Sequence, residues 1–299
     1  MLVSLVVITY NSSKYVLETL ESTRNQTYKD IELIVSDDCS TDTTLELCQS
    51  WVEKNKGRFV RTLVTQTHSN MGICGNYNHA LSQIRGDYVK YIAGDDILKP
   101  VCIERFVALV RPDVYLYFSA DEYFPNTPPS DGQMPLGHYN FPLPNVSARK
   151  QLRLMLAHHY GLAGPTLFAQ RSTLQKNGGF DMRFPMCEDW TIAMKYLSLN
   201  LRILSTNERL VLWRIHSDSV SHSNPAFISD LERAKRFYDR KYCLRLGMPL
   251  HLYHNELERY LARHKGQSSL AKYIGYMLRC FDLVHIWRKA FPPKEAEQS

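Results

Sequence analysis

The sequence lacks several features that would place it in a familiar class. Its seven cysteines are odd in number and include no Cys-x-x-Cys pair, which argues against a zinc site or a disulfide framework and favours reduced cytosolic thiols. No run of 18 apolar residues occurs, and the apolar start of the chain has neither a basic region nor a small-residue cleavage site. We therefore expect no transmembrane helix and no signal peptide, and we interpret that start as a buried strand.

Glycine-rich phosphate loops are also missing. Neither Gly-x-Gly-x-x-Gly nor Gly-x-x-x-x-Gly-Lys-[Ser/Thr] occurs in the chain. This absence argues against an ordinary dinucleotide-binding domain and against a P-loop enzyme. A diphosphate ligand would have to be held through a metal ion instead.

Excess positive charge is missing from most of the chain. Residues 1–230 carry 22 Lys and Arg against 23 Asp and Glu, whereas residues 231–299 carry 14 against 7. A basic segment is typical of proteins that contact a polyanion or an anionic membrane surface. Residues 270–289 have helical amphipathic spacing. Three interpretations of the basic segment stay open: a helical cap that packs on the rest of the chain, a helix in a membrane interface, and a contact with nucleic acid. The last has the least support, because no aromatic–basic platform or DNA-binding motif occurs.

Alternating periodicities over the first 120 residues predict a mostly parallel sheet. Apolar, β-branched runs predict buried strands at residues 2–8, 31–36, 59–65, 88–93 and 114–119. Between them, helical spacing predicts helices at residues 11–24, after Thr41 or Asp42, at 74–84 and at 100–110. Strand–helix alternation of this kind is typical of an α/β fold with a Rossmann-like sheet covered by helices on both faces.

The pattern breaks after residue 124. Residues 124–146 hold six of the 14 prolines and predict a long loop. Further along, we expect helices at 147–160 and 189–199, strands at the end of 161–169 and at 210–215, and a helical part from 225 to 290.

Polar clusters follow the first four expected strands. They are Thr9-Tyr10-Asn11, Asp37-Asp38, Asn70-Met71-Gly72 and Asp95-Asp96. Ligands of open parallel sheets bind beyond the carboxyl ends of the strands, so these clusters should converge on one site. Carboxylates without a nearby His or Cys suit Mg²⁺ or Mn²⁺ shared with a diphosphate. A single Asp pair is better explained as a helix cap, but two pairs at neighbouring strand ends favour a metal site.

Four segments, in order, resemble the inverting family 2 glycosyltransferases, which have the GT-A fold. They are LVVITYNSSKYVLETLESTRNQTYKDIELIVSDDCSTDTT, NMGICGNYNHALSQIRGDYVKYIAGDD, GGFDMRFPMCEDW and LWRIHSDSVSH. Each is weak alone, but together they cover about residues 1–222 and are specific. The resemblance implies a catalytic domain over 1–224, with a nucleotide-sugar-binding half at 1–120 and an acceptor half at 147–224. Residues 225–299 then form a basic helical extension.

The resemblance also implies roles for single residues. Ile8, Thr9 and Tyr10 line the nucleotide base, and Asp38 accepts the N3 proton of a uracil. The stretch from Asn70 through Gly72 to Asn78 packs on the nucleoside, although Tyr77 stands where many members have Arg.

The remaining implied residues concern the diphosphate. Asp95 faces the ribose or donor sugar, Asp96 holds Mn²⁺ or Mg²⁺, Arg214 contacts phosphate and His216 is a further metal ligand. Gly94 stands where many members have the first acid of an Asp-x-Asp motif. A divalent cation at this place would stabilise the departing nucleoside diphosphate.

Glu188 and Asp189 are the predicted catalytic pair. An inverting transfer needs one base, which takes the proton of the acceptor hydroxyl as that oxygen attacks the anomeric carbon. The resemblance places this base at Asp189, with Glu188 binding the acceptor or orienting the site. The alternative is that both acids favour the start of a helix.

The resemblance implies partners as well. The donor is a UDP-sugar, because Asp38 suits uracil, and the acceptor is a saccharide on a lipid diphosphate. The setting is bacterial O-antigen or capsule synthesis, in the cytoplasm and peripheral at the inner membrane, without nucleic acid. Two alternatives stay open: a sugar-phosphate nucleotidyltransferase and a non-catalytic nucleotide-sugar-binding module. Against the first, TYNSSKY stands where that class has a Gly-rich loop; against the second, Asp96 and Asp189 are both present.

Overall fold

The computed structural model describes residues 1–125, 146–159, 161–216 and 225–263. The chain divides into two compact units, one of residues 1–151 and 160–231 and the other of residues 152–159 and 232–299. The long loop predicted at 124–146 and the amphipathic segment 270–289 lie almost wholly outside the described residues.

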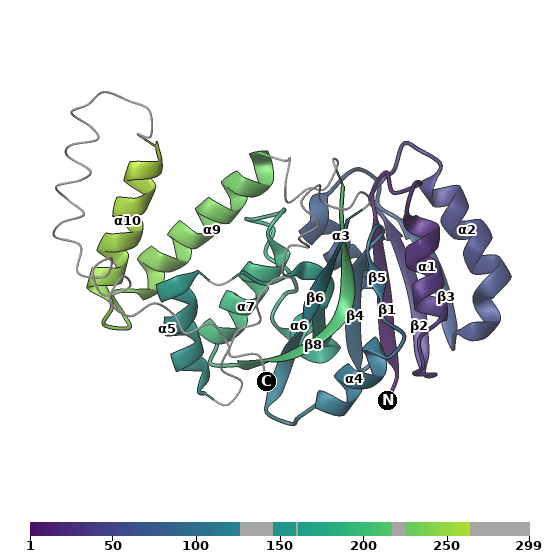
Figure 1. Cartoon of the computed structure of the whole chain (residues 1–299), viewed down its shortest axis with the longest axis horizontal. Coiled ribbons are helices and arrows are strands. Elements are labelled where there is room, and N and C mark those ends of the chain that lie inside the picture. The colour runs from purple at the N-terminus through teal and green to yellow at the C-terminus, as the bar shows by residue number, and fades with distance from the viewer. Residues whose placement is uncertain (126–145, 160, 217–224, 264–299) are drawn as a thin grey trace. The chain divides into compact units, whose positions relative to one another are not determined.

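Within the described residues, the first unit contains an eight-stranded sheet with the strand order β3-β2-β1-β4-β7-β6-β8-β5 (Figure 1). The first four strands in that order are mutually parallel, β7 is antiparallel to both of its neighbours, and β5 is antiparallel to β8. The strands are β1 (Val3–Thr9), β2 (Ile31–Asp37), β3 (Arg61–Gln66), β4 (Tyr88–Ala93), β5 (Ile97–Leu98), β6 (Val114–Pro125), β7 (Leu167–Gln170) and β8 (Arg202–Ile215). The prediction of a mostly parallel sheet is confirmed.

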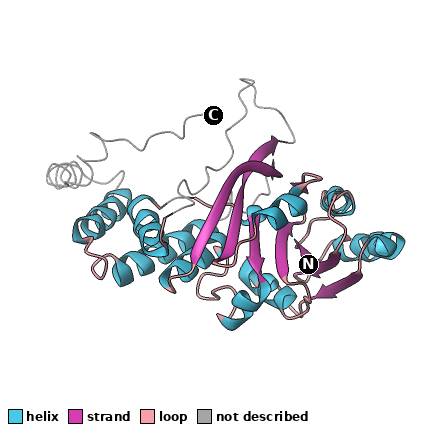
Figure 2. Cartoon of the chain, turned by 90° about the horizontal axis from the view of Figure 1, so that it is seen from below, coloured by secondary structure: helices cyan, strands magenta, loops and turns pink. Residues whose placement is uncertain are grey.

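Helices cover both faces of this sheet (Figure 2). On one face α1 (Val16–Arg24), α2 (Thr44–Asn55) and α4 (Cys102–Leu109) bury apolar residues against the odd-numbered side chains of β1. On the other face, Tyr77 of α3 (Gly72–Leu81) packs on Tyr91 of β4 with ring centroids 4.4 Å apart. Because helices cover both faces of the sheet, every residue of β1 and β2 is buried. This explains why these strands are apolar without alternation. Downstream lie α6 (Arg171–Lys176) and α7 (Glu188–Ser198), with the 3₁₀ turns η1 (Lys56–Arg58) and η2 (Gly164–Thr166) elsewhere in this unit.

The remaining helices are α5 (Ala148–His158), α9 (Pro225–Tyr242) and α10 (Pro249–Arg263). Inside the second unit the carboxylate of Asp239 is buried, lies 3.0 Å from the His159 ring and accepts a hydrogen bond from Arg259. The predicted helical character beyond residue 225 is confirmed as far as the description extends. No helix among the described residues is both long and apolar enough to cross a bilayer.

Local differences from the expected elements have physical causes. Helix α1 begins at Val16 and not directly after the predicted caps Asn11 and Ser12. Asn11 has a positive φ of 49°, and a turn in which the Ser12 carbonyl accepts from the Tyr15 and Val16 amides precedes the helix. Strands β6 and β8 are longer than expected because they pair in parallel over most of their lengths. Strand β5 was not predicted, since its two residues are too short to show any periodicity.

Candidate active site

The predicted polar clusters meet at one edge of the sheet. Thr9 at the end of β1 is opposite Asp37 at the end of β2, and Ile8 is opposite Ala93 at the end of β4. The buried hydroxyl of Thr9 donates to Asp37 Oδ1 over 2.8 Å. The strand ends that precede Asp38 and Asp95 therefore lie on either side of the end of β1, at the edge where the sequence predicts a ligand site.

Asp38 fixes the loop that precedes α3. Its buried carboxylate accepts hydrogen bonds from the Thr67 hydroxyl and the Met71 amide, both at 2.9 Å, and from the Gly72 amide at 2.8 Å. Asn70 Oδ1 accepts from the same Gly72 amide at 3.0 Å. Gly72 has φ +74°, which glycine adopts without strain and which aims its N–H at Asp38. Asp38 thus organises the predicted nucleoside-facing stretch from within.

The other predicted base-lining residues differ in exposure. Thr9 and Ile8 are buried in the end of β1, whereas Tyr10 is 47% exposed. Asn78 lies on the far end of α3, where its amide group donates to the Phe180 carbonyl and accepts from the Phe180 amide. The side chain of Asn78 therefore joins α3 to the segment before α7 and does not face the strand ends.

Strand β5 brings β8 to the acidic pair. Ile97 is opposite Leu212 and Leu98 is opposite Val211, so the same antiparallel register carried past the strand end places Asp95 opposite Arg214. The Arg214 amide donates to Asp96 Oδ1 over 2.9 Å, and His216 Nε2 lies 3.0 Å from Asp95 Oδ2.

The two acids of this pair have different environments. The Asp95 side chain is 30% exposed, whereas Asp96 is 1% exposed. Burial, followed by the charge of Asp95, raises the pKa of Asp96 well above its usual range, and the Arg214 amide together with the Lys90 and Arg214 charges opposes that rise. The accessible side chain at this edge of the sheet is therefore that of Asp95, whereas the Asp96 side chain is buried in the protein.

Arg214 is a buried cation at the centre of this arrangement. Its side chain is 4% exposed, and Nε donates to the Asp95 carbonyl over 2.7 Å. A terminal nitrogen pairs with Glu18 at 2.7 Å, and the guanidinium lies 4.7 Å from the Tyr15 ring and 4.8 Å from the Phe124 ring. The structure gives these contacts within the protein, and the phosphate contact stays a prediction. Sequence reasoning missed Glu18, because nothing local marks one exposed helix acid among many.

The residues present fit a divalent cation of the Mg²⁺ or Mn²⁺ kind. No group of three metal-binding side chains occurs among the residues that the structure describes. Asp95 and His216 supply two donors next to each other. Mg²⁺ typically takes one or two protein carboxylates and completes its shell with substrate phosphates and water, so a two-donor site is consistent with a cation that arrives with a diphosphate.

The second acidic pair opens α7. Glu188 is 8% exposed and its carboxyl lies against the Gly164 α-carbon so closely that a Cβ at residue 164 would overlap Oε1. Burial, and then the charge of Asp189, raise the pKa of Glu188 well above its usual range. Burial therefore favours the protonated form of Glu188, the more enclosed member of the pair, while the Asp189 side chain is half-buried.

The first turn of α3 connects the two acidic regions. Gly72 donates to Asp38, and two residues later the Cys74 amide donates to the Pro185 carbonyl over 2.9 Å. Burial raises the pKa of the Tyr77 phenol on the same helix, and charges from Glu188, Asp189 and Asp96 add to that rise. The strand-end loop and the start of α7 are thus held on one short helix.

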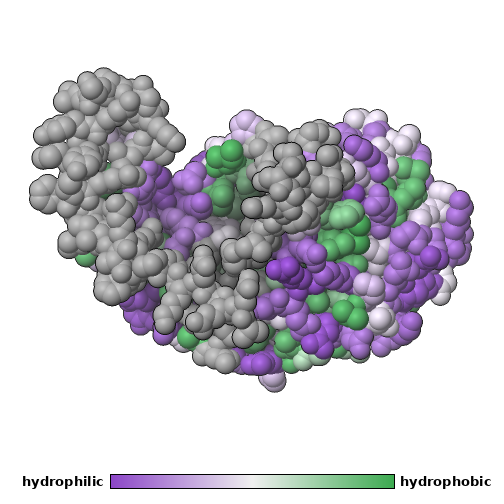
Figure 3. Space-filling view, viewed as in Figure 1, coloured by the Kyte–Doolittle hydropathy of each residue, from purple (hydrophilic) through white to green (hydrophobic). Residues whose placement is uncertain are grey.

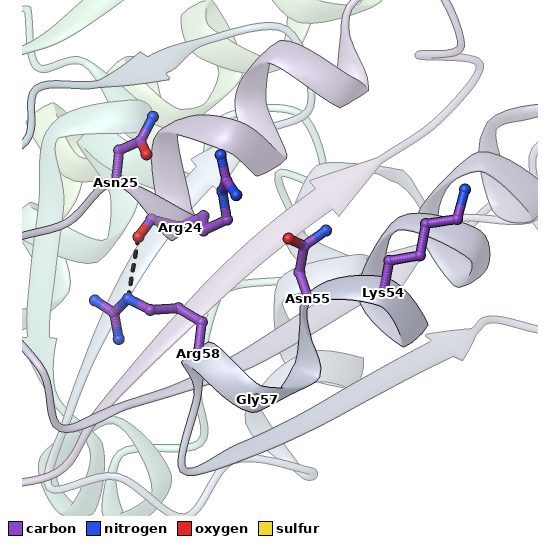
Figure 4. A pocket seen from close by; sticks show the side chains of 6 residues that line it. All are labelled: Arg24, Asn25, Lys54, Asn55, Gly57 and Arg58. Carbon is purple, nitrogen blue, oxygen red and sulfur yellow. Dashed lines mark hydrogen bonds between the residues drawn. The ribbon is translucent and has the colours of Figure 1, made fainter.

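A cavity of about 630 Å³ lies at the opposite edge of the sheet (Figure 4). It is lined by Arg24, Asn25, Lys54, Asn55, Gly57 and Arg58 at the carboxyl ends of α1 and α2. These helices run antiparallel to the strands, so their ends lie away from the polar clusters. Arg58 donates to the carbonyls of Arg24, Gln26 and Tyr28 and so closes the end of α1. We assign this cavity a structural role.

Comparison with known proteins identifies the family. The sequence model of Glycosyl transferase family 2 matches residues 4–164, more than half of the chain. The chain belongs to glycosyl transferase family 2. The predicted family resemblance is thereby confirmed, and the match spans β1 to η2 with the strand-end clusters inside it.

Curated relatives of this family 2 protein differ in how much they share with it. The Escherichia coli protein "UDP-Glc:alpha-D-GlcNAc-diphosphoundecaprenol beta-1,3-glucosyltransferase WfaP" is 27% identical over 222 residues, which cover 74% of this chain and 80% of WfaP. Chondroitin synthase of Pasteurella multocida is 32% identical over 224 residues, or 75% of this chain. Chondroitin synthase of E. coli is 33% identical over 161 residues, or 53% of this chain. The chain spans 22% of the length of either chondroitin synthase.

Solved structures establish the fold. Residues 1–349 of Staphylococcus aureus TarS, in complex with UDP-GlcNAc, superimpose with a TM-score of 0.66 at 22% identity, over 89% of this chain and 75% of TarS. The mannosyltransferase PcManGT of Pyrobaculum calidifontis, in complex with GDP-Man and Mn²⁺, gives 0.60 at 17% identity, over 98% and 88% of the two chains. The predicted GT-A fold is confirmed.

Proposed function

We propose that this chain is an inverting glycosyltransferase that moves a sugar from a UDP-sugar to a hydroxyl of a lipid-diphosphate-linked saccharide. The observation that carries the proposal is the joining of the Asp38 loop and the Glu188-Asp189 pair through the first turn of α3. Such an arrangement sets a nucleotide-binding edge beside a candidate base. Membership of glycosyl transferase family 2 supports this reaction class.

The donor site is proposed at the ends of β1 and β2. Asp38 holds the loop of Asn70 and Gly72 in place and offers its carboxylate edge to the N3–H of uracil. Thr9 and Ile8 form the floor, and the exposed Tyr10 ring is available to cover the base. UDP-GlcNAc in the TarS complex and UDP-Glc in the name of WfaP both support a uridine nucleotide.

Asp95 and His216 are proposed to hold Mn²⁺ or Mg²⁺, with Asp96 behind them as a buried support. The cation, when bound, supplies positive charge to the departing diphosphate. The Mn²⁺ in the PcManGT complex supports a metal in this fold. The geometry favours Asp95 as the acid that faces the cation, because Asp96 is buried and its carboxylate accepts a hydrogen bond from the Arg214 amide.

Asp189 is proposed as the general base. An inverting displacement requires a carboxylate that accepts the acceptor hydroxyl's proton while the nucleotide leaves on the opposite face. Burial raises the pKa of Glu188, and this favours Asp189 as the charged member of the pair. Glu188, as a neutral acid, donates a hydrogen bond and orients the acceptor side.

The proposed acceptor and location rest on similarity and charge. The name of WfaP specifies a sugar on diphosphoundecaprenol, and 74% of this chain matches it. We therefore propose a role in bacterial surface-polysaccharide synthesis, peripheral at the cytoplasmic face of the inner membrane. The 14 Lys and Arg against 7 acids in residues 231–299 suit anionic headgroups, and no nucleic-acid partner is proposed.

The test is calorimetric binding and turnover with a panel of nucleotide sugars in Mn²⁺, Mg²⁺ and EDTA. We expect one UDP-sugar to bind only with metal, and Asp95→Asn to abolish that binding. Transfer to a lipid-diphosphate saccharide should then release UDP. Release of pyrophosphate from a sugar phosphate and UTP would instead identify a nucleotidyltransferase, and binding without transfer to any acceptor would favour a binding module.

A further inference from the structure

One residue of β8 holds both acids that follow β4. The Arg214 backbone N–H binds the Asp96 carboxylate, and the Arg214 side chain binds the Asp95 carbonyl. Two residues later, His216 contacts the Asp95 carboxylate itself. The position of Asp95 relative to His216 therefore depends on where the Arg214 guanidinium is anchored.

Helix α1 supplies the anchor. Glu18, in its first turn, pairs with an Arg214 terminal nitrogen at 2.7 Å. The Tyr15 ring lies 4.8 Å from the His216 ring and 4.7 Å from the guanidinium, so it packs against both. The Lys14 ammonium lies 5.0 Å from the centre of the same Tyr15 ring. The hydrophobic surface near α1 and β5 is visible in Figure 3.

We propose that Glu18 and Tyr15 are positioning residues for the cation site formed by Asp95 and His216. This inference rests on the proposed function, because it takes these two side chains as the cation-binding pair. Neither Glu18 nor Tyr15 touches the reacting atoms. Both act through Arg214 and the His216 ring.

The physical reason is competition for a buried cation. A guanidinium that is 4% exposed requires a carboxylate partner, and the carboxylate that pairs with it is that of Glu18. The Asp95 carboxylate belongs to the residue whose carbonyl accepts from the guanidinium, and the Asp96 carboxylate is near enough for the Arg214 charge to lower its pKa. While Glu18 neutralises the guanidinium, the Asp95 carboxylate stays available to His216 and to a metal. Without the Glu18 charge, the same guanidinium turns towards Asp95 and occupies the oxygens that the metal needs. Tyr15 limits that movement by packing between the guanidinium and the imidazole.

The experiment measures Mn²⁺ binding by the full chain, by electron paramagnetic resonance of free Mn²⁺, together with donor kinetics over a Mn²⁺ series. The variants are Glu18→Gln and Tyr15→Leu, with Glu18→Asp as a charge-preserving rescue. Glu208→Gln is the matched control, because the exposed Arg105–Glu208 ion pair also ties a helix to β8. Thermal melting of each variant identifies loss of folding.

We expect Glu18→Gln to weaken Mn²⁺ affinity by about 10-fold, the lower end for residues that orient metal ligands. The kcat at saturating Mn²⁺ should stay within about 2-fold of the parent, Glu18→Asp should recover most of the affinity, and Glu208→Gln should match the parent. Tyr15→Leu should weaken Mn²⁺ binding in the same direction.

Equal Mn²⁺ affinity in Glu18→Gln and Glu208→Gln, with Asp95→Asn still abolishing binding, would overturn the positioning role and leave the proposed function standing. If the parent protein itself binds neither Mn²⁺ nor a UDP-sugar, the proposed function fails and this inference fails with it. A Glu18→Gln variant that melts like the parent but loses only kcat would also overturn the positioning role.

Discussion

The two acidic pairs of this protein look alike in sequence but have opposite surroundings. Asp95-Asp96 and Glu188-Asp189 each contain one buried and one more accessible carboxyl. Burial and the charge of the adjacent acid raise the pKa of both buried carboxyls, but at Asp96 the Arg214 amide and the positive charges of Lys90 and Arg214 oppose that rise. The charge that acts on the buried Glu188 is that of its own neighbour, and its carboxyl lies against the bare α-carbon of Gly164.

This difference separates two kinds of chemistry. Cations and N–H donors stabilise carboxylates, so the first pair is suited to carry negative charge towards a metal and a diphosphate. Burial beside another acid stabilises the protonated form, so the second pair is suited to divide into a neutral acid and a charged base. The comparison therefore assigns binding to one pair and proton transfer to the other, and the following changes test it.

The largest effect is expected for Asp189→Asn. Removal of the base should lower kcat by about 10³-fold, within the range of general-base contributions, while donor affinity stays at the parent value. Single-turnover transfer assays and donor calorimetry measure the two quantities. Asp181→Asn, eight residues earlier and paired with Arg183, is the control and should retain transfer. Retained transfer in Asp189→Asn would show that the base lies elsewhere.

Asp95→Asn should break the other pair. Loss of a charged ligand should raise the Mn²⁺ concentration for half-maximal activity by about 10²-fold, because a bound cation contributes several kcal/mol to stabilising developing charge. At the Mn²⁺ concentration that saturates the parent, metal-dependent donor binding is then abolished. Metal titration of the transfer rate measures this shift. The control is Asp87→Asn. Asp87 lies at the opposite end of β4, where its carboxylate accepts a hydrogen bond from the Leu2 amide. An unchanged Mn²⁺ dependence in Asp95→Asn would remove Asp95 from the metal site.

Lys90 tests the cationic surroundings of the first pair. It is fully buried, its Nζ donates to the carbonyls of Tyr91 and Pro165, and burial lowers its pKa from 10.5 to about 8. Between these two pKa values the unfolded chain binds the proton and the folded chain does not, so stability rises with pH there. Relative to Lys90→Met, the free energy of unfolding of the parent should increase by about 3 kcal/mol from pH 8 to pH 10.5.

Urea unfolding of parent and Lys90→Met across that pH range checks the slope. Groups other than Asp96 and Cys102, whose pKa values the Lys90 charge lowers, titrate alike in both proteins, so the difference reports on Lys90 and these two neighbours. A difference that stays flat with pH would mean that Lys90 keeps its ordinary pKa in the folded state.

Gly164→Ala should disturb the second pair. The new Cβ would overlap Glu188 Oε1, and such overpacking costs about 1–3 kcal/mol of stability. We expect a lower melting temperature and a kcat reduced by about 10-fold, since the neighbouring base shifts with Glu188. Gly57→Ala is a matched control, because a Cβ there meets nothing within 4 Å. Equal behaviour of the two variants would show that Glu188 can move at no cost.

The smallest effect is expected for Glu188→Gln. If Glu188 already holds a proton at neutral pH, the neutral amide replaces it with little electrostatic change. The kcat/KM should fall by less than about 10-fold, far less than for Asp189→Asn. A pH series of kcat/KM for both variants measures the contrast. A loss as large as that of Asp189→Asn would mean that Glu188 acts as the charged member.

The sequence predicted what local patterns determine. Continuous apolar strands and the acids after them were enough to place Thr9, Asp38 and Asp95 at one edge, because parallel strands all end on the same side. The contacts of Arg214 with Glu18 and with the Asp95-Asp96 pair could not be predicted. They depend on the antiparallel register of the two-residue strand β5 with β8, which brings together residues more than one hundred positions apart.

The surroundings of Asp96 and Asn78 show the same limit. Asp95 and Asp96 follow β4 in a turn that the Asp96 amide closes on the Ala93 carbonyl, and the sequence does not say which of the two carboxyls such a turn leaves accessible. Asn78 lies on a helix whose far end turns to Phe180, a contact set by chain folding 102 positions away.

The central claim is that the two acidic pairs divide binding and proton transfer between them. Its most direct test is calorimetric titration of the preferred UDP-sugar into Asp189→Asn, with Mn²⁺ and with EDTA. The account predicts donor binding as tight as in the parent, fully dependent on Mn²⁺, in a protein that no longer transfers sugar. Loss of that metal-dependent binding in Asp189→Asn would contradict it, because the second pair would then belong to the donor site.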